Sequence, residues 1–130
     1  MRIARGRAGV PSEQRAETFT GRVWADPVLA PEDGVTVNNV FFEPGARTHW
    51  HTHAEGQVLQ VTHGEGWVQM RDGAGGRITA GDIVHIGPGE EHWHGAGPTS
   101  YLLHVAVSLG VTDWLEPVSD DDYRRVIGVG

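Results

Sequence analysis

The sequence predicts an all-β protein, built as one closed antiparallel barrel or double-sheet jelly roll with a short C-terminal helix. The 130 residues include 19 glycines and 7 prolines, and such frequent turn residues favour many short strands over long helices. The candidate strands between these turns are short, numerous and evenly spaced, which is typical of closed all-β folds. A chain of this length is also expected to form one domain around one core.

A flexible lead-in is expected over residues 1–17, because its 8–15 stretch is polar and interrupted by Pro11. The single domain then fills residues 18–130, without an internal repeat or linker. Its first strand should stop before Pro27, since proline is excluded from strand interiors. A turn is expected at 64–66 and a hairpin loop at 72–76. The expected strands are 20–24, 35–43, 48–53, 57–62, 67–71, 77–79, 83–86, 92–94 and 101–108.

One helix is expected after Ser119, near the end of the chain. Ser119 and Asp122 have the spacing of a capping box, in which the serine side chain accepts a bond from a backbone N–H of the first turn. The acidic residues Asp120, Asp121 and Asp122 would lie at the positive end of the helix dipole. This acidic run is therefore interpreted as a cap and a solvated face.

Composition excludes several classes of function. The net charge of −7 argues against nucleic-acid binding, which needs a basic face. The absence of cysteine removes disulfides, thiolate metal sites and thiol nucleophiles, so a metal site must use nitrogen and oxygen donors. No segment approaches the roughly 20 apolar residues of a membrane span. Residues 1–7 carry three arginines without a following apolar core, so no secretory signal is predicted and the expected location is the cytoplasm.

The histidines carry the most information about chemistry. Six of the eight lie in two groups, His49, His51 and His53 and then His85, His92 and His94. On one strand His49, His51 and His53 would share a face, and two imidazoles on an inward face can bind one metal ion. The alternative for this group is a solvated basic edge.

The residues around the histidines form two motifs. The first runs from Gly45 through His51, His53 and Gln57 to Gly64, and the second from Gly81-Asp82 through Gly87 to His92. In residue type and order this pair resembles the two signature motifs of the cupin superfamily. The resemblance implies a metal held by four side chains, which fall on His51, His53, Gln57 and His92. The sequence departs from the common pattern at Gln57, where glutamate is usual, at Gly87, where proline is usual, and at Ala96, where asparagine is common.

Gln57 changes the charge of the predicted site. A glutamine oxygen can bind a metal without bringing negative charge, so the ion would be a stronger Lewis acid than one with a carboxylate ligand. The alternative is that Gln57 only hydrogen-bonds a ligand while Glu55 coordinates the metal. Four protein ligands leave one or two open positions on a five- or six-coordinate ion, as a catalytic site requires. Three nitrogens and one oxygen accept Mn, Fe, Co, Ni, Cu or Zn.

A narrower resemblance covers residues 19–123. The segments Phe42-Glu43-Pro44-Gly45, His51-Thr52-His53, Gly56-Gln57 and His92-Trp93-His94-Gly95 are similar to small bacterial cupins that include manganese-dependent hydroxynitrile lyases. This resemblance implies one manganese ion per chain, a homodimer or tetramer, and reversible cleavage of a cyanohydrin to an aldehyde and hydrogen cyanide. An exposed edge at 20–24 would also favour pairing of two chains.

Strand parity supplies candidates for the rest of the site. His94 shares a face with His92, and His104 shares one with Leu102 and Ala106, so both histidines are candidate pocket bases that titrate near neutral pH. The resemblance also places additional histidines at these two positions; a purely structural role is the alternative for each. Asn38 and Val40 share one face of the 35–43 strand and are predicted to line the substrate pocket, together with His49.

Two other functions remain open at this point. One is a dioxygenase that uses iron, manganese or copper at the same site, although such enzymes favour a carboxylate ligand where this chain has Gln57. The other is a non-catalytic module that binds a metal or a small ligand. Fold alone does not decide between them, because cupins host many chemistries.

Overall fold

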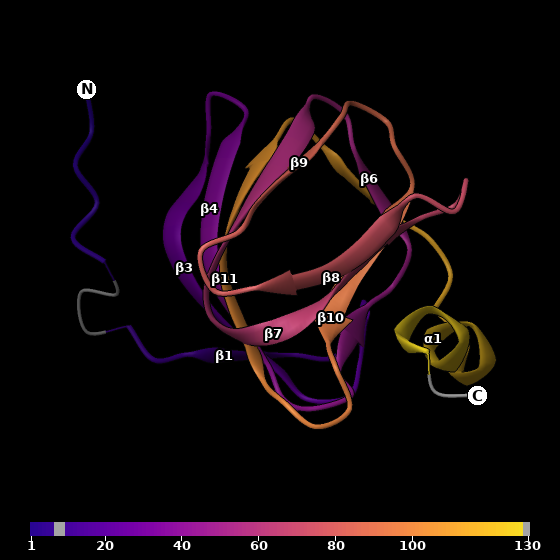
Figure 1. Ribbon diagram of the computed structural model, residues 1–130. Coiled ribbons are helices and arrows are strands. Elements are labelled where there is room, and N and C mark those ends of the chain that lie inside the picture. The colour runs from indigo at the N-terminus through magenta and orange to yellow at the C-terminus, as the bar shows by residue number, and fades with distance from the viewer. Residues whose placement is uncertain (7–9, 129–130) are drawn as a thin grey trace.

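The computed structural model describes residues 1–6 and 10–128, and in these residues twelve strands curl into a nearly closed antiparallel barrel (Figure 1). The predicted all-β fold class with a short C-terminal helix is confirmed. The elements are β1 (Glu13–Arg15), β2 (Phe19–Thr20), β3 (Val23–Glu32), β4 (Val35–Phe42), β5 (Arg47–Thr48), β6 (His51–His53), β7 (Gly56–Met70), β8 (Gly75–Thr79), β9 (Ile83–Ile86), β10 (His92–Ala96), β11 (Leu102–Leu109), β12 (Thr112–Trp114) and α1 (Asp120–Ile127).

Two sheets face each other across the barrel and share one strand. The strands follow the order β1-β3-β4-β11-β7-β10-β5-β2, with β9 and β8 also paired to β7, and β6 joined to both β10 and β12. The first half of β7 pairs with β11 and β9, and its second half pairs with β10 and β8. Because β7 belongs to both sheets, it holds β6 and β10, which carry the predicted histidine ligands, opposite β4 and β11.

The predicted turn at 64–66 is wrong, because β7 runs through it without a break. The chain bends there instead, at Gly64, whose φ is +77°. A Cβ on Gly64 would lie 1.9 Å from the carbonyl oxygen of Tyr101, so only glycine permits this close approach. The pairing of β7 with β11 also shifts register between Leu103 and His104. The glycines predicted to reverse the chain therefore redirect one strand from the first sheet to the second.

The expected 48–53 strand is interrupted. Backbone bonds from His49 N to Thr18 O (2.9 Å) and from Trp50 N to Glu116 O (3.0 Å) separate β5 from β6. β5 pairs with β2 and β10, whereas β6 pairs with β10 and β12. The strict alternation that put His49 on the face of His51 therefore does not hold.

A short strand, β1, lies near the start of the chain. Within the expected 1–17 lead-in, whose residues 7–9 lie outside the described residues, β1 pairs with residues 23–25 of β3. The expectation that the next strand ends before Pro27 is wrong, since β3 continues to Glu32. Pro27 lies beyond the part of β3 that pairs with β1, and just before a register shift between Pro27 and Leu29. Both are places where a strand tolerates a missing N–H.

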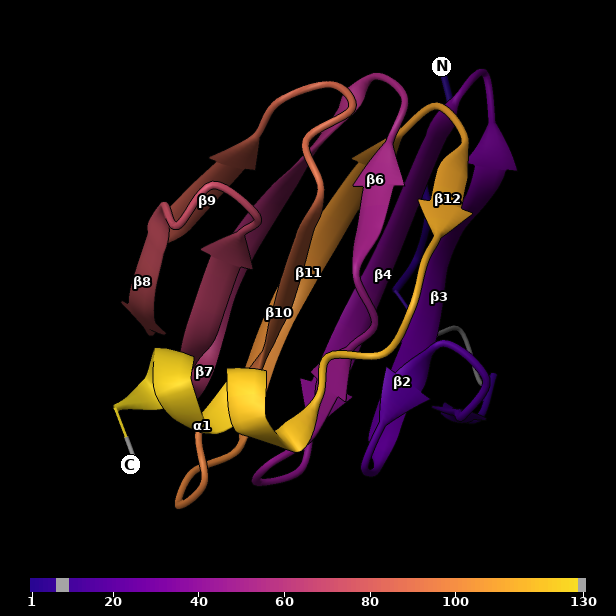
Figure 2. The same ribbon diagram turned by 90° about the vertical axis from the view of Figure 1, so that its right-hand side faces the viewer.

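Two apolar clusters hold the molecule together. The larger fills the barrel and includes Phe42, Leu59 and Leu102, each with 0% exposure. The smaller lies between α1 and the outside of β10, where Trp50, Trp93, Val118 and Tyr123 pack together; Figure 2 shows α1 lying across the outside of the barrel.

The helix begins as predicted, with the Ser119 hydroxyl accepting a bond from Asp122 N at 3.1 Å. Arg47 fixes α1 to the barrel by donating to Val118 O (2.9 Å) and Asp120 Oδ1 (2.7 Å). Among the described residues, no helix has the length and apolar character needed to cross a membrane.

Candidate metal centre

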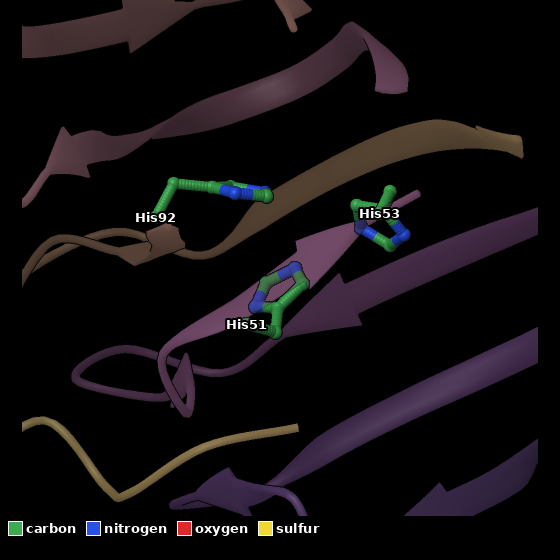
Figure 3. Close-up of side chains that lie close together, drawn as sticks. All are labelled: His51, His53 and His92. Atoms are coloured by element: carbon green, nitrogen blue, oxygen red, sulfur yellow. The ribbon is translucent and has the colours of Figure 1, made fainter. Parts of the chain in front are cut away.

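Three buried imidazoles meet inside the barrel. His51 and His53 come from β6 and His92 from β10, and the register places His92 directly opposite His51. Their exposures are 1%, 3% and 0%. One ring nitrogen from each lies within 4.8 Å of the others, and Figure 3 shows His92 reaching from its own strand towards the other two. Metal–nitrogen bonds of about 2.1 Å join ligand atoms up to about 4.2 Å apart, so small side-chain shifts let one ion contact all three.

The Nδ1 atom of each imidazole is held from behind. His51 Nδ1–H donates to His49 O at 2.9 Å, and His92 Nδ1–H donates to Glu90 O at 2.9 Å. His53 Nδ1 lies 3.0 Å from Thr112 Oγ1. The bonds to the two carbonyls leave Nε2 of His51 and His92 with its lone pair directed to the shared space, as metal-binding histidines require, and His53 has the same arrangement when its Nδ1–H donates to Thr112.

The amide of Gln57 completes the cluster. Its Nε2 donates to Ser108 Oγ at 3.0 Å, which turns its Oε1 towards His92 Nε2 at 3.1 Å. Since His92 donates through Nδ1, both atoms of this 3.1 Å contact are acceptors. His53 Nε2 is also buried without a hydrogen-bond partner. A cation in this space would satisfy all of these lone pairs, so the donor set fits a divalent metal.

Burial keeps the cluster in the state that metals need. Desolvation lowers the pKa of His53 to about 4, with a further contribution from nearby His92. Burial likewise lowers the pKa of His92, and it lowers that of His51 well below its ordinary value. The three imidazoles are therefore neutral at pH 7 and available as ligands. Glu55, the alternative ligand, has an exposed side chain after β6 and lies outside this cluster.

A cavity of about 260 Å³ opens next to the cluster. His51, His53 and Gln57 form part of its wall, and the predicted residues Asn38 and Val40 face them from β4. His49 is not among the lining residues; its contribution is the carbonyl that holds His51. The other described residues that line the cavity are Phe19, Pro31, Thr36, Thr48, His94, Ala106, Ser108, Thr112 and Trp114.

The two additional histidines form a hydrogen-bonded pair with different positions. His94 Nδ1 and His104 Nε2 lie 3.0 Å apart and share one proton. His94 lines the cavity, whereas His104 has 0% exposure and stands behind it. Burial lowers the pKa of His104 to about 4 and that of His94 well below its ordinary value, the latter with a further contribution from His104. Both rings are neutral at pH 7, and His94 Nε2 has no hydrogen-bond partner among the described residues.

Sequence reasoning missed the wall supplied by β12. This three-residue strand pairs with β6, with Thr112 opposite His53 and Trp114 opposite His51. Thr112 therefore contacts the His53 ring, and Trp114 packs against the His51 ring. Ser108 was also missed, although it has the same strand parity as His104 and could have been found from it.

Comparisons with known proteins found one matching family and several relatives. The family described as the AraC-like ligand binding domain matches residues 43–121. The (R)-mandelonitrile lyase of Granulicella tundricola is 45% identical over 96% of this chain and 100% of that protein. The acireductone dioxygenase of Gluconacetobacter diazotrophicus is 33% identical over 58% of this chain, a segment equal to 44% of that enzyme. The crystal structure of a cupin-like protein from Thermotoga maritima superimposes with a TM-score of 0.82 and 40% identity, over 86% of this chain and 90% of the other.

Proposed function

The chain belongs to the cupin superfamily, and from this premise we propose that it is a metal-dependent lyase that cleaves cyanohydrins to an aldehyde and hydrogen cyanide. One observation carries the proposal. A cluster of neutral side chains that can bind a metal lies beside the same cavity as the hydrogen-bonded pair His94 and His104. The full-length similarity to a mandelonitrile lyase supports the same activity.

The proposed metal site consists of His51, His53, His92 and Gln57. All four are neutral donors, and the contact between Gln57 Oε1 and His92 Nε2 is the feature that best fits a cation. A bound divalent metal would act as a Lewis acid for the substrate oxygen. The donor set accepts several metals, and we propose manganese because the motifs resemble those of manganese-dependent lyases.

The proposed base is His94. Its Nδ1 is engaged with His104 and its Nε2 is free of protein partners, so Nε2 is the atom able to take a proton from a bound substrate. When His94 Nδ1–H donates to His104 Nε2, the lone pair of His94 is on Nε2, the tautomer that a general base needs. In this arrangement His104 is a positioning residue that accepts the bond from His94 Nδ1–H.

The reaction balances with these groups alone. His94 Nε2 removes the hydroxyl proton of the cyanohydrin, the carbon–oxygen double bond forms, and the bond to the cyano carbon breaks with its electron pair on cyanide. The cyanide then takes the proton from His94 and leaves as hydrogen cyanide. No oxidant is consumed and the histidine returns to its neutral state.

The second candidate is a dioxygenase, and the similarity to acireductone dioxygenases favours it. That similarity covers less than half of those enzymes. The neutral Gln57 also counts against it, because a carboxylate ligand balances the charge of an oxidised metal. The two candidates differ in whether oxygen is consumed.

The deciding experiment measures cyanide release from mandelonitrile by the manganese-loaded protein under nitrogen. We expect release without oxygen uptake, loss of release after chelation, and a decrease of about a hundredfold or more in His94→Ala with its metal retained. His63→Ala is the matched control, since His63 is exposed on β7. Stoichiometric oxygen uptake, or release that survives chelation, would overturn the proposal.

We further propose that the protein forms a homodimer through the outside of the β4–β11–β7 sheet. The expected edge at 20–24 is partly covered by β1, so the edge is no longer the best support. Most outward side chains of these central strands are apolar and half-buried, with Asn39 and Gln60 as polar members beside Val105, and α1 packs elsewhere. This outer face consists of Val37, Phe41, Val58, Leu103, Val105 and Val107.

A further inference from the structure

Building on the proposed lyase activity, we infer that Trp114 and Phe19 form the seat for an aromatic ring of the substrate and give the enzyme its preference for aryl cyanohydrins. All five tryptophans are described, and Trp114 alone among them is exposed, at 40%. It nevertheless lines the cavity, together with Phe19. A large exposed apolar side chain in a concave site is a feature of ligand-binding surfaces.

Trp114 stands directly beside the metal centre. Its ring centroid lies 4.6 Å from that of His51, with the planes inclined by 32°. The backbone fixes this arrangement, because β12 places Trp114 opposite His51 in the register. Trp114 therefore extends from a buried metal-binding imidazole to solvent, and a ring in contact with it lies next to the metal centre.

An aromatic wall continues from Trp114 to the proposed base. Phe19 is 5.6 Å from Trp114, with planes 54° apart, and Phe42 is 6.2 Å from Phe19 at 56°. Phe42 in turn meets His94 edge-on, at 5.8 Å and 77°. These distances and tilts are those that aromatic pairs prefer, so a substrate ring can join the wall with the same geometry. Its reacting carbon would then lie between the metal-binding side chains and His94.

The wall contributes more for an aromatic than for a saturated ring. Both rings gain binding free energy from leaving water, but only the aromatic ring also gains the attraction between aromatic rings that depends on their relative orientation. That attraction corresponds to a preference of roughly twofold to tenfold in kcat/KM. The preference, unlike total activity, is specific to the ring that contacts Trp114.

The test compares mandelonitrile with its cyclohexyl analogue, using the metal-loaded protein. The ratio of the two kcat/KM values cancels damage common to both substrates, and comparing this ratio between a variant and the wild type also cancels the difference in their intrinsic reactivity. Trp114→Leu should lower this ratio by about twofold to tenfold, Phe19→Leu should lower it less, and Trp114→Phe should keep most of it. Trp24→Leu is the matched control, since Trp24 points away from the cavity on β3 and donates to Glu43 at 3.1 Å.

A binding measurement separates this inference from the proposed function. The affinities for benzyl alcohol and cyclohexylmethanol are measured by ligand-observed NMR, and metal content is checked because Trp114 packs on His51. An unchanged ratio and unchanged benzyl alcohol affinity in Trp114→Leu would overturn the aromatic seat, even if both cyanohydrins are cleaved. If neither is cleaved but Trp114→Leu loses benzyl alcohol affinity selectively, the lyase proposal fails and the seat stands.

Discussion

The orientation of the Gln57 amide can be tested through Ser108, which does not touch the metal in our assignment. Ser108 Oγ accepts a hydrogen bond from Gln57 Nε2, and this bond turns Oε1 inward. In Ser108→Ala the amide can rotate by 180° and donate from Nε2 to the bare His92 Nε2. Metal binding must then reverse this rotation and leave a buried N–H unpaired, which costs about 1–3 kcal/mol. We expect the metal dissociation constant to rise by about fivefold to 150-fold.

The assay is competition for Mn²⁺ or Zn²⁺ with a chromophoric chelator. Ser108→Thr keeps a hydroxyl and should bind nearly as tightly as the wild type, and Ser100→Ala is a matched control because the Ser100 hydroxyl donates to the adjacent Tyr101 O. Unchanged affinity in Ser108→Ala would refute the reasoning, since it would mean that Gln57 is not a ligand or that its amide needs no orientation.

Four further outcomes are expected. The purified protein should carry about one transition metal per chain, and the double variant His51→Ala/His92→Ala should carry none by elemental analysis; a full complement in that variant would show that the ligands lie elsewhere. Gln57→Glu should retain the metal but release cyanide at least about tenfold more slowly, because the added negative charge opposes the developing anion; an equal or faster rate would make the neutral amide irrelevant. Light scattering should give at least twice the 14.1 kDa chain mass and a smaller mass for Val105→Asp, whereas a monomeric wild type would exclude the dimer. The metal-free protein should lose stability as pH falls, because burial lowers the pKa of His104 in the folded state from 6.5 to about 4. Between these two values the unfolded chain binds a proton that folded His104 does not bind. The free energy of unfolding should therefore decrease by up to about 3 kcal/mol between about pH 6.5 and pH 4. Urea unfolding at pH 7.5 and 5 should therefore show a weaker pH dependence in His104→Gln than in the wild type, and equal dependence would contradict this assignment.

Much of the site could be predicted because it depends on local spacing. The pair His51 and His53 needs only the two-residue repeat of a strand, and β6 provides it. The same parity places Asn38 and Val40 towards the cavity from β4. The Ser119 cap is also local, and the structure forms it as expected.

Features set by tertiary pairing could not be predicted in this way. His49 left the common face because its N–H bonds Thr18, a partner distant from the histidine motif. Gly64 is a residue type typical of turns, but here it lies inside β7, where it allows the strand to bend close to the Tyr101 carbonyl. Trp114 entered the site only because β12 pairs with β6, and a three-residue strand has too little pattern to be recognised alone.

The distribution of unsatisfied polar atoms supports a functional centre independently of any motif. In the part of the chain that the structure describes, six buried side-chain atoms lack a hydrogen-bond partner, and three of them belong to His53, His94 and His104. Each such atom destabilises the fold by about 1–3 kcal/mol unless something satisfies it. A large apolar cluster fills the rest of the barrel, so leucine or phenylalanine would serve stability better at these positions. Several buried polar atoms without partners in one place are typical of a site that binds a ligand or carries out chemistry. The unpaired nitrogens of His53 and His94 have different proposed roles. His53 Nε2 faces the space for a cation, and His94 Nε2 belongs to a residue that lines the cavity proposed for substrate.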